Sequence, residues 1–450
     1  MTTPDGATGG RGAGGPAAGG TPSGGSPPDG TSSGGTSSGG TSSGGTSSGG
    51  RGAGVRASDG RHVGARADTR AGARADARAD ATVADVAVVG GGIIGLATAE
   101  RLSAHGLSVV VIDERGPAGG VTGASGGLVR ALDLSAAHSW AAEGLDRYLR
   151  RGHHGRWPAV RETGGLTLFG ADDTARAAEG VERVRATGHA AELLDARQIA
   201  RAFPGLTPPE GFTGVYEPRA GWLPARETAE AMLRDAGSVT FLGGVRALEI
   251  VTARARVTGV RTTAGLLTTP AVLLAAGVHS TELARTAGVE LPLRTRSVSF
   301  CVFAPRGREG GGREGGGPEG GGPDVPGPLP TVLDTTTGGW LRRWDDGTAV
   351  LAGVPSPVRD VLPTVTRGVS AAEEERVRAV ARHRYPLLAD AALVDGVTAH
   401  DALAPGDVGT VTAWPDPYGL VTATGWNGGG FKQAPAAGRY AAELVREVLA

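Results

Sequence analysis

The first clear hydrophobic pattern in the chain is a continuous apolar run at Val86–Val89. Such a run is typical of a strand buried on both faces of a parallel sheet. A glycine-rich turn follows, then a helical stretch over 93–105 that ends at Gly106. A second apolar run, SVVVID, ends at Asp113. This order predicts a strand, a helix and a second parallel strand, which together form a βαβ unit.

Two later segments combine an apolar strand with small residues. AVLLAAGVHSTELA, at 271–284, is an apolar strand ending in Ala-Ala-Gly, where only small side chains would fit against a bound ligand. The segment 419–449 predicts a strand, a glycine loop and a helix, with Pro435 in the first turn of that helix. Apolar residues fall on one face of this helix, as expected for packing on a sheet: Ala441, Leu444, Val445 and Val448.

Composition separates a folded part from two polar segments. Glycine accounts for 79 of the 450 residues, and residues 1–81 consist almost entirely of small and polar types, with a TSSGG repeat at 31–50. Because so little apolar surface cannot offset the cost of ordering the backbone, we predict a disordered tail there. A similar stretch at 306–330 predicts a disordered surface insertion. The remaining roughly 340 residues are enough for one large or two medium domains.

Charge and cysteine content narrow the class of protein. The formal net charge is −1, so no strong field favours nucleic acid or an acidic membrane as a partner. No apolar run has the length of a membrane span or the form of a signal peptide. The single cysteine, Cys301, excludes an intrachain disulfide, and no Cys/His spacing resembles a zinc site. We therefore expect a soluble, cytoplasmic protein without a metal site.

The turn after the first strand, GGGIIG, has the spacing of a dinucleotide-binding loop. Gly90 permits the tight turn, Gly92 lets the backbone approach a pyrophosphate, and Gly95 allows the helix to pack closely on the strand. The helix N-terminus adds amide donors and a partial positive charge. Asp113, 18 positions after Gly95, can accept hydrogen bonds from both ribose hydroxyls, and Glu114 is the weaker candidate. This unit alone does not distinguish FAD from NAD(P).

Five motifs follow one another along the folded part of the chain. They are GGGIIG with Asp113, GASGG at 123–127, GWLPARETAEAML at 221–233, LLAAG at 273–277 and GWNGGGFKQAP at 425–435. In this order they resemble the D-amino acid oxidase superfamily of FAD-dependent oxidoreductases, nearest its glycine oxidase and sarcosine oxidase branch. The resemblance covers residues 83–305 and 331–450.

The resemblance implies an α/β fold with two domains. A Rossmann-like FAD-binding domain is assembled from discontinuous segments at about 82–135, 222–290 and 400–450. An antiparallel-sheet α+β substrate domain comprises about 136–221 and 291–399, with strands near 164–170, 294–303 and 340–353 and a helix over 366–383. The residues expected to contact FAD are Gly90, Gly92, Ile93, Ile94, Gly95, Asp113, Glu114, Thr122, Ala124, Ser125, Val245, Ala276, Gly277, Gly428, Gly429, Gly430, Phe431 and Lys432.

Lys432 is the only lysine among the 45 lysine and arginine residues of the chain, and it lies in the last motif. The resemblance implies that Lys432 binds the substrate carboxylate beside the flavin, with Arg130 as its partner. A carboxylate removed from water needs charged donors, which this pair supplies. Arg342 and Arg343, in GGWLRRWDDG, are competing carboxylate anchors by resemblance to the amino acid oxidase branch. A simple exposed position for Lys432 is the alternative, because most lysines are exposed.

Two features depart from the sarcosine oxidase pattern. No cysteine precedes the ALAPGDVGTV turn at 402–411, where that branch attaches FAD covalently, and an ungapped count places His400 there. Non-covalent FAD is therefore expected, with a histidyl link through His400 as the alternative and Cys301 as a core residue. The lysine that activates oxygen in that branch would fall within 349–353, and no lysine is present there. Two alternatives therefore stay open: reoxidation by dioxygen is slow, or the electrons pass to another acceptor.

The sequence thus predicts an FAD-dependent enzyme that oxidises the C–N bond of a small amino acid or a secondary or cyclic amine bearing a carboxylate. Hydride transfer to flavin N5 would give an imine that water hydrolyses, with O2 as the acceptor. The alternatives are a dehydrogenase of an amine or hydroxy acid with a non-oxygen acceptor, and a non-catalytic flavin-binding subunit. A plain NAD(P) dehydrogenase would leave the C-terminal GGGFK motif without a purpose.

Overall fold

The computed structural model describes residues 82–134, 140–305, 325, 327–344, 347–363 and 366–450. The predicted tail at 1–81 and most of the predicted insertion lie outside these ranges. Five residues near the end of that insertion are described, 325 and 327–330. Two of them, Val325 and Leu329, are buried and pack into a hydrophobic cluster with Phe203. The prediction of an exposed loop is wrong for these two positions, because apolar side chains gain free energy from burial there.

A six-stranded sheet carries the predicted βαβ unit. Its order is β20-β21-β13-β2-β3-β9, and all neighbours are parallel except β20 and β21. Its central strands are buried on both faces, as their apolar sequences require. The strands are β2 (Val86–Val89), β3 (Val109–Asp113), β9 (Val239–Gly243), β13 (Ala271–Leu274), β20 (Thr410–Ala413) and β21 (Leu420–Thr424).

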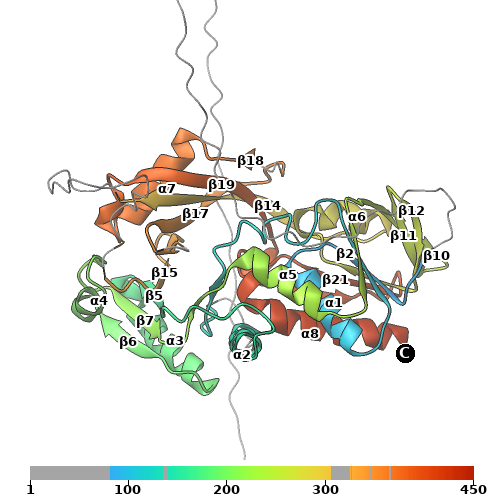
Figure 1. Cartoon of the computed structure of the whole chain (residues 1–450), viewed down its shortest axis with the longest axis horizontal. Coiled ribbons are helices and arrows are strands. Elements are labelled where there is room, and N and C mark those ends of the chain that lie inside the picture. The colour runs from blue at the N-terminus through green and yellow to red at the C-terminus, as the bar shows by residue number, and fades with distance from the viewer. Residues whose placement is uncertain (1–81, 135–139, 306–324, 326, 345–346, 364–365) are drawn as a thin grey trace, which may run out of the picture. The chain divides into compact units, whose positions relative to one another are not determined.

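Two helices contact this sheet, α1 (Ile93–Ala104) and α8 (Gly430–Leu449), and two further helices pack on them, α5 (Ala225–Asp235) and α2 (Trp140–His153). Figure 1 shows α1 close to α5 and α8, and α1 packs against both. The α1–α8 crossing is close because a Cβ at Gly438 would come within 2.7 Å of the Ala97 carbonyl carbon. Helix α2 packs on α8 in turn. Helix α8 begins at Gly430, so Pro435 lies inside it and not in its first turn as predicted.

Two smaller sheets and one helix accompany the six-stranded sheet. The four-stranded sheet has the order β1-β12-β11-β10, and the two-stranded sheet pairs β4 with β8. Helix α6 contacts β10. The bounds are β1 (Thr82–Val83), β4 (Leu128–Val129), β8 (Gly221–Trp222), β10 (Ala247–Ala253), β11 (Arg256–Thr262), β12 (Gly265–Thr268) and α6 (Ser280–Thr286).

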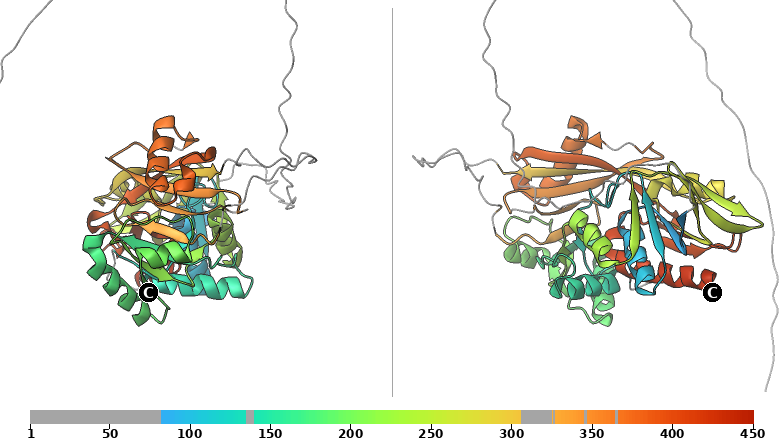
Figure 2. Two further views of the ribbon diagram at one scale, coloured as in Figure 1. Left: turned by 90° about the vertical axis from the view of Figure 1, so that its left-hand side faces the viewer. Right: turned by 45° about the vertical axis from the view of Figure 1, so that its right-hand side comes forward.

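A nine-stranded sheet forms the second part of the fold, in the order β18-β19-β14-β17-β16-β15-β5-β7-β6. Its pairs are antiparallel except β15 with β5, so the predicted α/β class with an antiparallel second sheet is confirmed. The long strands β14 and β19 are visible in Figure 2, and β19 reaches the 277–279 turn that follows β13. The strands are β5 (Gly165–Phe169), β6 (Glu192–Asp195), β7 (Thr213–Glu217), β14 (Arg294–Ala304), β15 (Thr331–Asp334), β16 (Trp340–Arg343), β17 (Val350–Arg359), β18 (Thr366–Arg367) and β19 (Ala392–Leu403).

Helices α3 (Thr174–Ala186), α4 (Ala196–Ala202) and α7 (Ala371–Arg382) pack on the nine-stranded sheet. The predicted helix over 366–383 begins later than expected. Residues 366–367 form β18, Gly368 adopts φ 86°, and the Ser370 side chain accepts a hydrogen bond from the Glu373 amide as the N-cap of α7. A capping serine therefore sets the start of this helix.

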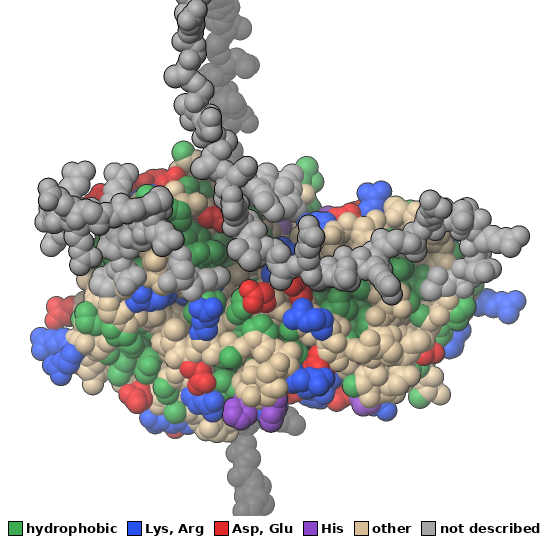
Figure 3. All heavy atoms as spheres, viewed as in Figure 1, with side chains coloured by type: hydrophobic (Ala, Val, Ile, Leu, Met, Phe, Trp, Pro, Cys, Tyr) green, Lys and Arg blue, Asp and Glu red, His purple; other side chains and the backbone are tan. Residues whose placement is uncertain are grey.

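On the face shown in Figure 3, acidic and basic side chains lie interspersed, in keeping with the formal net charge of −1. Within the described ranges, no helix combines the length and the apolar character that crossing a bilayer requires.

Candidate functional site

A cavity of about 1010 Å³ lies at the carboxyl ends of β2, β3 and β13 and extends to β14, β19 and the start of α8. In open α/β sheets this edge is where ligands bind. Most of the residues expected to contact a dinucleotide line it: Gly90, Gly92, Ile93, Ile94, Asp113, Glu114, Thr122, Ser125, Val245, Ala276, Gly277, Gly428, Gly429, Gly430, Phe431 and Lys432. Gly95 and Ala124 do not line it.

The glycine turn is built by close backbone contacts that a side chain would prevent. Gly90 has φ 115°, and a Cβ there would lie 2.4 Å from the Ala275 carbonyl oxygen on the neighbouring strand. A Cβ at Gly95 would lie 2.0 Å from the carbonyl oxygen of Gly90. Gly95 is therefore required for packing inside the turn, although it does not line the cavity.

The N-terminus of α1 faces the cavity. Thr122 caps it from the following loop, since its Oγ1 accepts a hydrogen bond from the Ile93 amide at 3.0 Å. The N-cap residue of the helix is Gly92, which has no side chain to cap the amides, and the first turn has no acidic residue that would repel an anion. Its N-terminal amides and partial positive charge can thus bind an anionic group.

Asp113 stabilises the turn from the end of β3. Its Oδ2 accepts from the Gly91 amide at 2.8 Å, and its Oδ1 accepts from the amides of Arg115 and Gly116. The same carboxylate lies in the cavity wall. Glu114 points to a more exposed position, with its side chain 43% exposed and near Arg115.

Lys432 lies in the first turn of α8 and is buried, with 8% of its surface exposed. Its Nζ fits beside Gly429, where a Cβ would lie only 2.8 Å away. Burial lowers the pKa of Lys432 from 10.5 to about 8, Arg130 lowers this pKa as well, and Asp133 opposes the shift. The exposed-lysine alternative is excluded by this position.

Arg130 follows β4 and lines the same cavity. Its Nε is buried without a hydrogen-bond partner in the described part of the chain. Burial lowers the pKa of Arg130, an effect that the carboxylates of Glu217 and Asp133 oppose. Glu217, on β7, is buried and accepts from the Ala131 and Leu132 amides. Burial raises the pKa of Glu217, while Arg130 lowers it.

Two polar residues beside Lys432 were not predicted from the sequence. Asp133 and Gln433 both line the cavity, and the Gln433 Nε2 donates to the Asp133 Oδ2 at 2.5 Å. The Lys432 Nζ lies 3.4 Å from the same Asp133 oxygen. Nothing local in the sequence marks Asp133, because its partners are 299 and 300 positions away along the chain.

The nine-stranded sheet supplies an apolar wall to the cavity, through Val298, Phe300, Leu333, Trp340 and Pro355. The Phe300 and Trp340 rings pack with their centroids 5.3 Å apart. Apolar walls with a few convergent polar groups are typical of small-molecule sites.

One ion pair also lies in this wall. Arg296 on β14 pairs with Asp401 on β19 at 3.2 Å, next to the space that a Cβ at Gly428 would occupy. His400, the predicted alternative attachment point, lines the cavity, and burial lowers its pKa. Cys301 does not line it: Cys301 is buried in the core of the nine-stranded sheet, as predicted, and burial raises its pKa to about 12.

The competing anchors Arg342 and Arg343 do not line this cavity. The Arg342 Nε donates to the Gly126 carbonyl at 2.7 Å, and its guanidinium lies 3.7 Å from the centre of the Trp222 ring. Arg343 donates to the Gly347 carbonyl at 3.1 Å. Both side chains thus bind backbone carbonyls of neighbouring loops.

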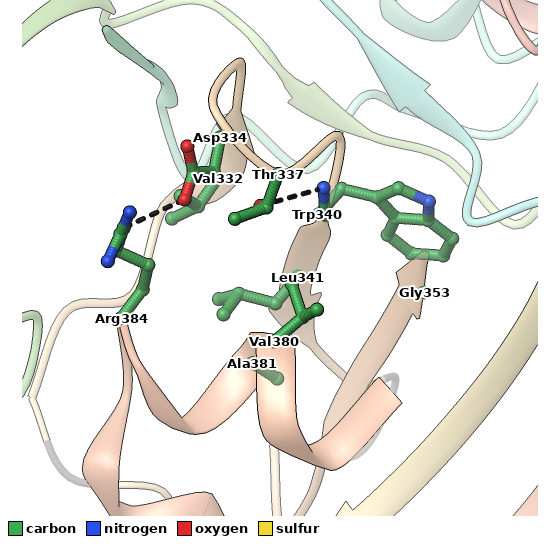
Figure 4. A pocket seen from close by; sticks show the side chains of 10 residues that line it. Val332, Asp334, Thr337, Trp340, Leu341, Gly353, Val380, Ala381 and Arg384 are labelled. Carbon is green, nitrogen blue, oxygen red and sulfur yellow. Dashed lines mark hydrogen bonds and ion pairs between the residues drawn. The ribbon is translucent and has the colours of Figure 1, made fainter. Parts of the chain in front are cut away.

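Figure 4 shows a second cavity, between β16, β17 and the end of α7. Its volume is about 10 Å³, which is room for at most one water molecule. The Trp340 ring lies beside Gly353, where a Cβ would come within 2.3 Å of it, and Arg384 pairs with Asp334 at 2.8 Å. This cavity is too small for a substrate.

The large cavity fits a dinucleotide. A glycine cradle, a helix N-terminus and a carboxylate at the end of the second strand converge on it, as pyrophosphate and ribose binding require. The fold and the site therefore define a dinucleotide-binding α/β protein whose nine-stranded sheet supplies part of the cavity wall.

Residues 85–444 match the model of the family described as DAO, FAD dependent oxidoreductase, and the chain belongs to that family. Its cofactor is accordingly FAD, and the predicted resemblance to the glycine oxidase and sarcosine oxidase branch is confirmed.

Two relatives are similar to this chain over slightly less than half of its length. The chain is 32% identical over 221 residues to glycine oxidase of Pseudomonas putida, covering 46% of this chain and 59% of that protein. It is 30% identical over 244 residues to sarcosine oxidase subunit beta of Arthrobacter sp, covering 48% and 57%. The matches thus span less than two thirds of these curated relatives.

Solved structures share the fold over a larger part of the chain. L-proline dehydrogenase from P. horikoshii aligns with a TM-score of 0.70 and 19% identity, covering 82% of this chain and 94% of that one. Glycine oxidase from Geobacillus kaustophilus aligns with a TM-score of 0.66 and 20% identity, covering 81% and 95%.

Proposed function

We propose that this flavoprotein oxidises the C–N bond of a small amino acid, or of a secondary or cyclic amine, that carries a carboxylate. The observation that carries the proposal is the position of Arg130 and Lys432, two cationic side chains in the wall of the cavity that the dinucleotide turn also lines. The named relatives support the same class of substrate, since they include a glycine oxidase, a sarcosine oxidase subunit and a D-amino acid dehydrogenase.

The protein would bind and orient the substrate. The Lys432 ammonium and the Arg130 guanidinium would bind its carboxylate and offset the cost of removing that group from water. The apolar wall of Val298, Phe300 and Trp340 would exclude water and hold the carbon beside the nitrogen in one orientation.

Bound FAD supplies an acceptor for hydride from the carbon that carries the nitrogen. The substrate loses that hydride and a proton from nitrogen, which leaves an imine. Water then hydrolyses an acyclic imine to an oxo acid and an amine or ammonia, and opens a cyclic imine to a single amino-oxo acid.

The test is an anaerobic screen of the purified yellow protein with glycine, sarcosine, D-amino acids and cyclic imino acids. We expect at least one of these compounds to bleach the visible flavin absorbance. Bleaching by dithionite but by no member of the screen would contradict the proposal and favour a non-catalytic flavin-binding subunit.

For the electron acceptor we propose O2, with a non-oxygen acceptor as the second candidate. The second candidate is favoured by one observation: residues 349–353 contain no lysine, and of β17 only Pro355 lines the cavity. Peroxide formed in step with substrate during aerobic turnover would support O2. Reduced flavin that persists in air but is reoxidised by a quinone or dye would support the second candidate.

A further inference from the structure

Asp133 lies in the loop after β4 and is 7% exposed. Its Oδ2 contacts two consecutive residues of α8: it accepts from the Gln433 Nε2 at 2.5 Å and lies 3.4 Å from the Lys432 Nζ. A single carboxylate oxygen therefore holds both polar side chains that the start of α8 directs into the cavity.

Lys432 needs such a partner. Its ammonium is buried, and the cationic Arg130 lies on the same side, and both effects favour the neutral amine. Asp133 acts in the opposite direction through its charge and its hydrogen bond. Within the described residues, Asp133 is the acidic side chain that forms an ion pair with Lys432.

The other charged groups near this cluster are engaged elsewhere. Glu217 on β7 accepts from the amides of residues 131 and 132. Arg183 on α3 donates to the backbone carbonyl of Asp133, which fixes the loop rather than the carboxylate. The Arg296–Asp401 pair lies beside Gly428, in the turn that leads into α8.

We propose that Asp133 is a positioning residue of this site: its carboxylate holds the Lys432 ammonium and the Gln433 amide toward the cavity and keeps Lys432 charged. The role of the charged lysine in binding a substrate carboxylate rests on the proposed function. The effect of Asp133 on the protonation of Lys432 is independent of that function.

The sequence permits a direct test, because Lys432 is the only lysine in the chain. Lysine labelled with ¹³C at Cε gives one resonance in the holoenzyme, whose chemical shift follows the ionisation of the side chain. In the wild-type protein we expect a midpoint near pH 8, where burial places the pKa of Lys432 at about 8. In Asp133→Asn the midpoint should fall by about one pH unit or more, since the carboxylate that favours the charged lysine is lost.

Glu143→Gln is the matched control. Glu143 on α2 pairs with Arg439 on α8 at 2.7 Å, outside the cavity, so its loss also removes a carboxylate that holds α8. Its midpoint should equal that of the wild type. A midpoint in Asp133→Asn that is unchanged or higher would overturn the proposal.

If Asp133→Asn yields no folded holoenzyme, Asp133→Glu moves the carboxylate by one methylene and retains its charge. The lysine midpoint must then differ from the wild-type value, and an unchanged midpoint would also overturn the proposal. Once a substrate is found, we expect Asp133→Asn to change KM more than kcat. The factor by which KM rises should be about ten times the factor by which kcat falls, as expected for a lost ground-state contact. A failed substrate screen with a shifted midpoint would reject the reaction and leave the positioning role standing.

Discussion

The Tyr148 hydroxyl donates a hydrogen bond to the carbonyl oxygen of Phe431, at 2.8 Å. This carbonyl lies four residues before Pro435, which has no N–H to bond with it inside α8. Tyr148, on α2, is fully buried, and its ring stacks on that of Phe431. The tyrosine thereby satisfies the carbonyl that the proline leaves unpaired, one residue before Lys432.

Removal of this hydroxyl should destabilise the protein. Tyr148→Phe keeps the stacked ring but leaves the Phe431 carbonyl buried and unpaired, which costs about 1–3 kcal/mol. Denaturant unfolding of the holoenzyme would measure the loss. Adding Pro435→Ala to Tyr148→Phe restores an N–H donor and should recover part of the stability. Equal stability of Tyr148→Phe and wild type would show that the carbonyl finds another partner.

Lys432→Met should impair the reaction with a carboxylate substrate. The change keeps an unbranched side chain but removes a charged donor, for which we expect a loss of about 10- to 100-fold in kcat/KM. Stopped-flow reduction of the flavin under anaerobic conditions is the measurement. Arg439→Met, on the same helix but outside the cavity, serves as the control. Unchanged single-turnover reduction in Lys432→Met would remove the assigned role.

Binding of a carboxylate should weaken as pH rises above about 8. The protonated lysine attracts the carboxylate, and burial lowers the pKa of Lys432 from 10.5 to about 8, so the attraction is lost from pH 8 upward rather than from pH 10.5. Acetate, which has no amine to titrate, would show this as a fall in affinity of up to about tenfold per pH unit. Perturbation of the flavin absorbance would report its binding. The same titration in Lys432→Met should lack this alkaline limb, and an identical limb would assign it to another group.

Gly90→Ala should abolish flavin binding. The new Cβ would meet the Ala275 carbonyl oxygen at 2.4 Å, at a φ of 115° that an alanine rarely adopts. Gly106→Ala is the control, because Gly106 also has a positive φ, 81°, but no atom lies within 4 Å of its Cβ position. We expect that variant to lose about 1–2 kcal/mol and keep its flavin. The measurement is the flavin content per chain of the two purified variants, and flavin retained by Gly90→Ala would contradict the prediction.

Denaturation should release all of the flavin into the supernatant. Cys301 is buried away from the cavity, and the attachment point predicted as the alternative is His400 in the cavity wall. Acid precipitation followed by absorbance of both fractions is the measurement. Colour that stays with the pellet, and that His400→Asn abolishes, would instead establish a histidyl link.

The βαβ unit and its cofactor loop could be predicted because the determinants are local. Val86–Val89, the glycine spacing and Asp113 lie within one short segment, and each follows from backbone sterics or from burial of a continuous apolar run. Lys432 was also identifiable, since it is the single lysine in a chain otherwise rich in arginine.

Only the tertiary structure decided which side chains meet. It places Asp133 against Lys432 and Gln433, brings Tyr148 to the carbonyl that Pro435 leaves unpaired, and binds Arg342, which does not line the cavity, to the backbone carbonyl of Gly126. Each of these contacts joins segments more than two hundred residues apart. Side-chain direction across such distances depends on how whole helices and sheets pack, and no local pattern in the sequence records that packing.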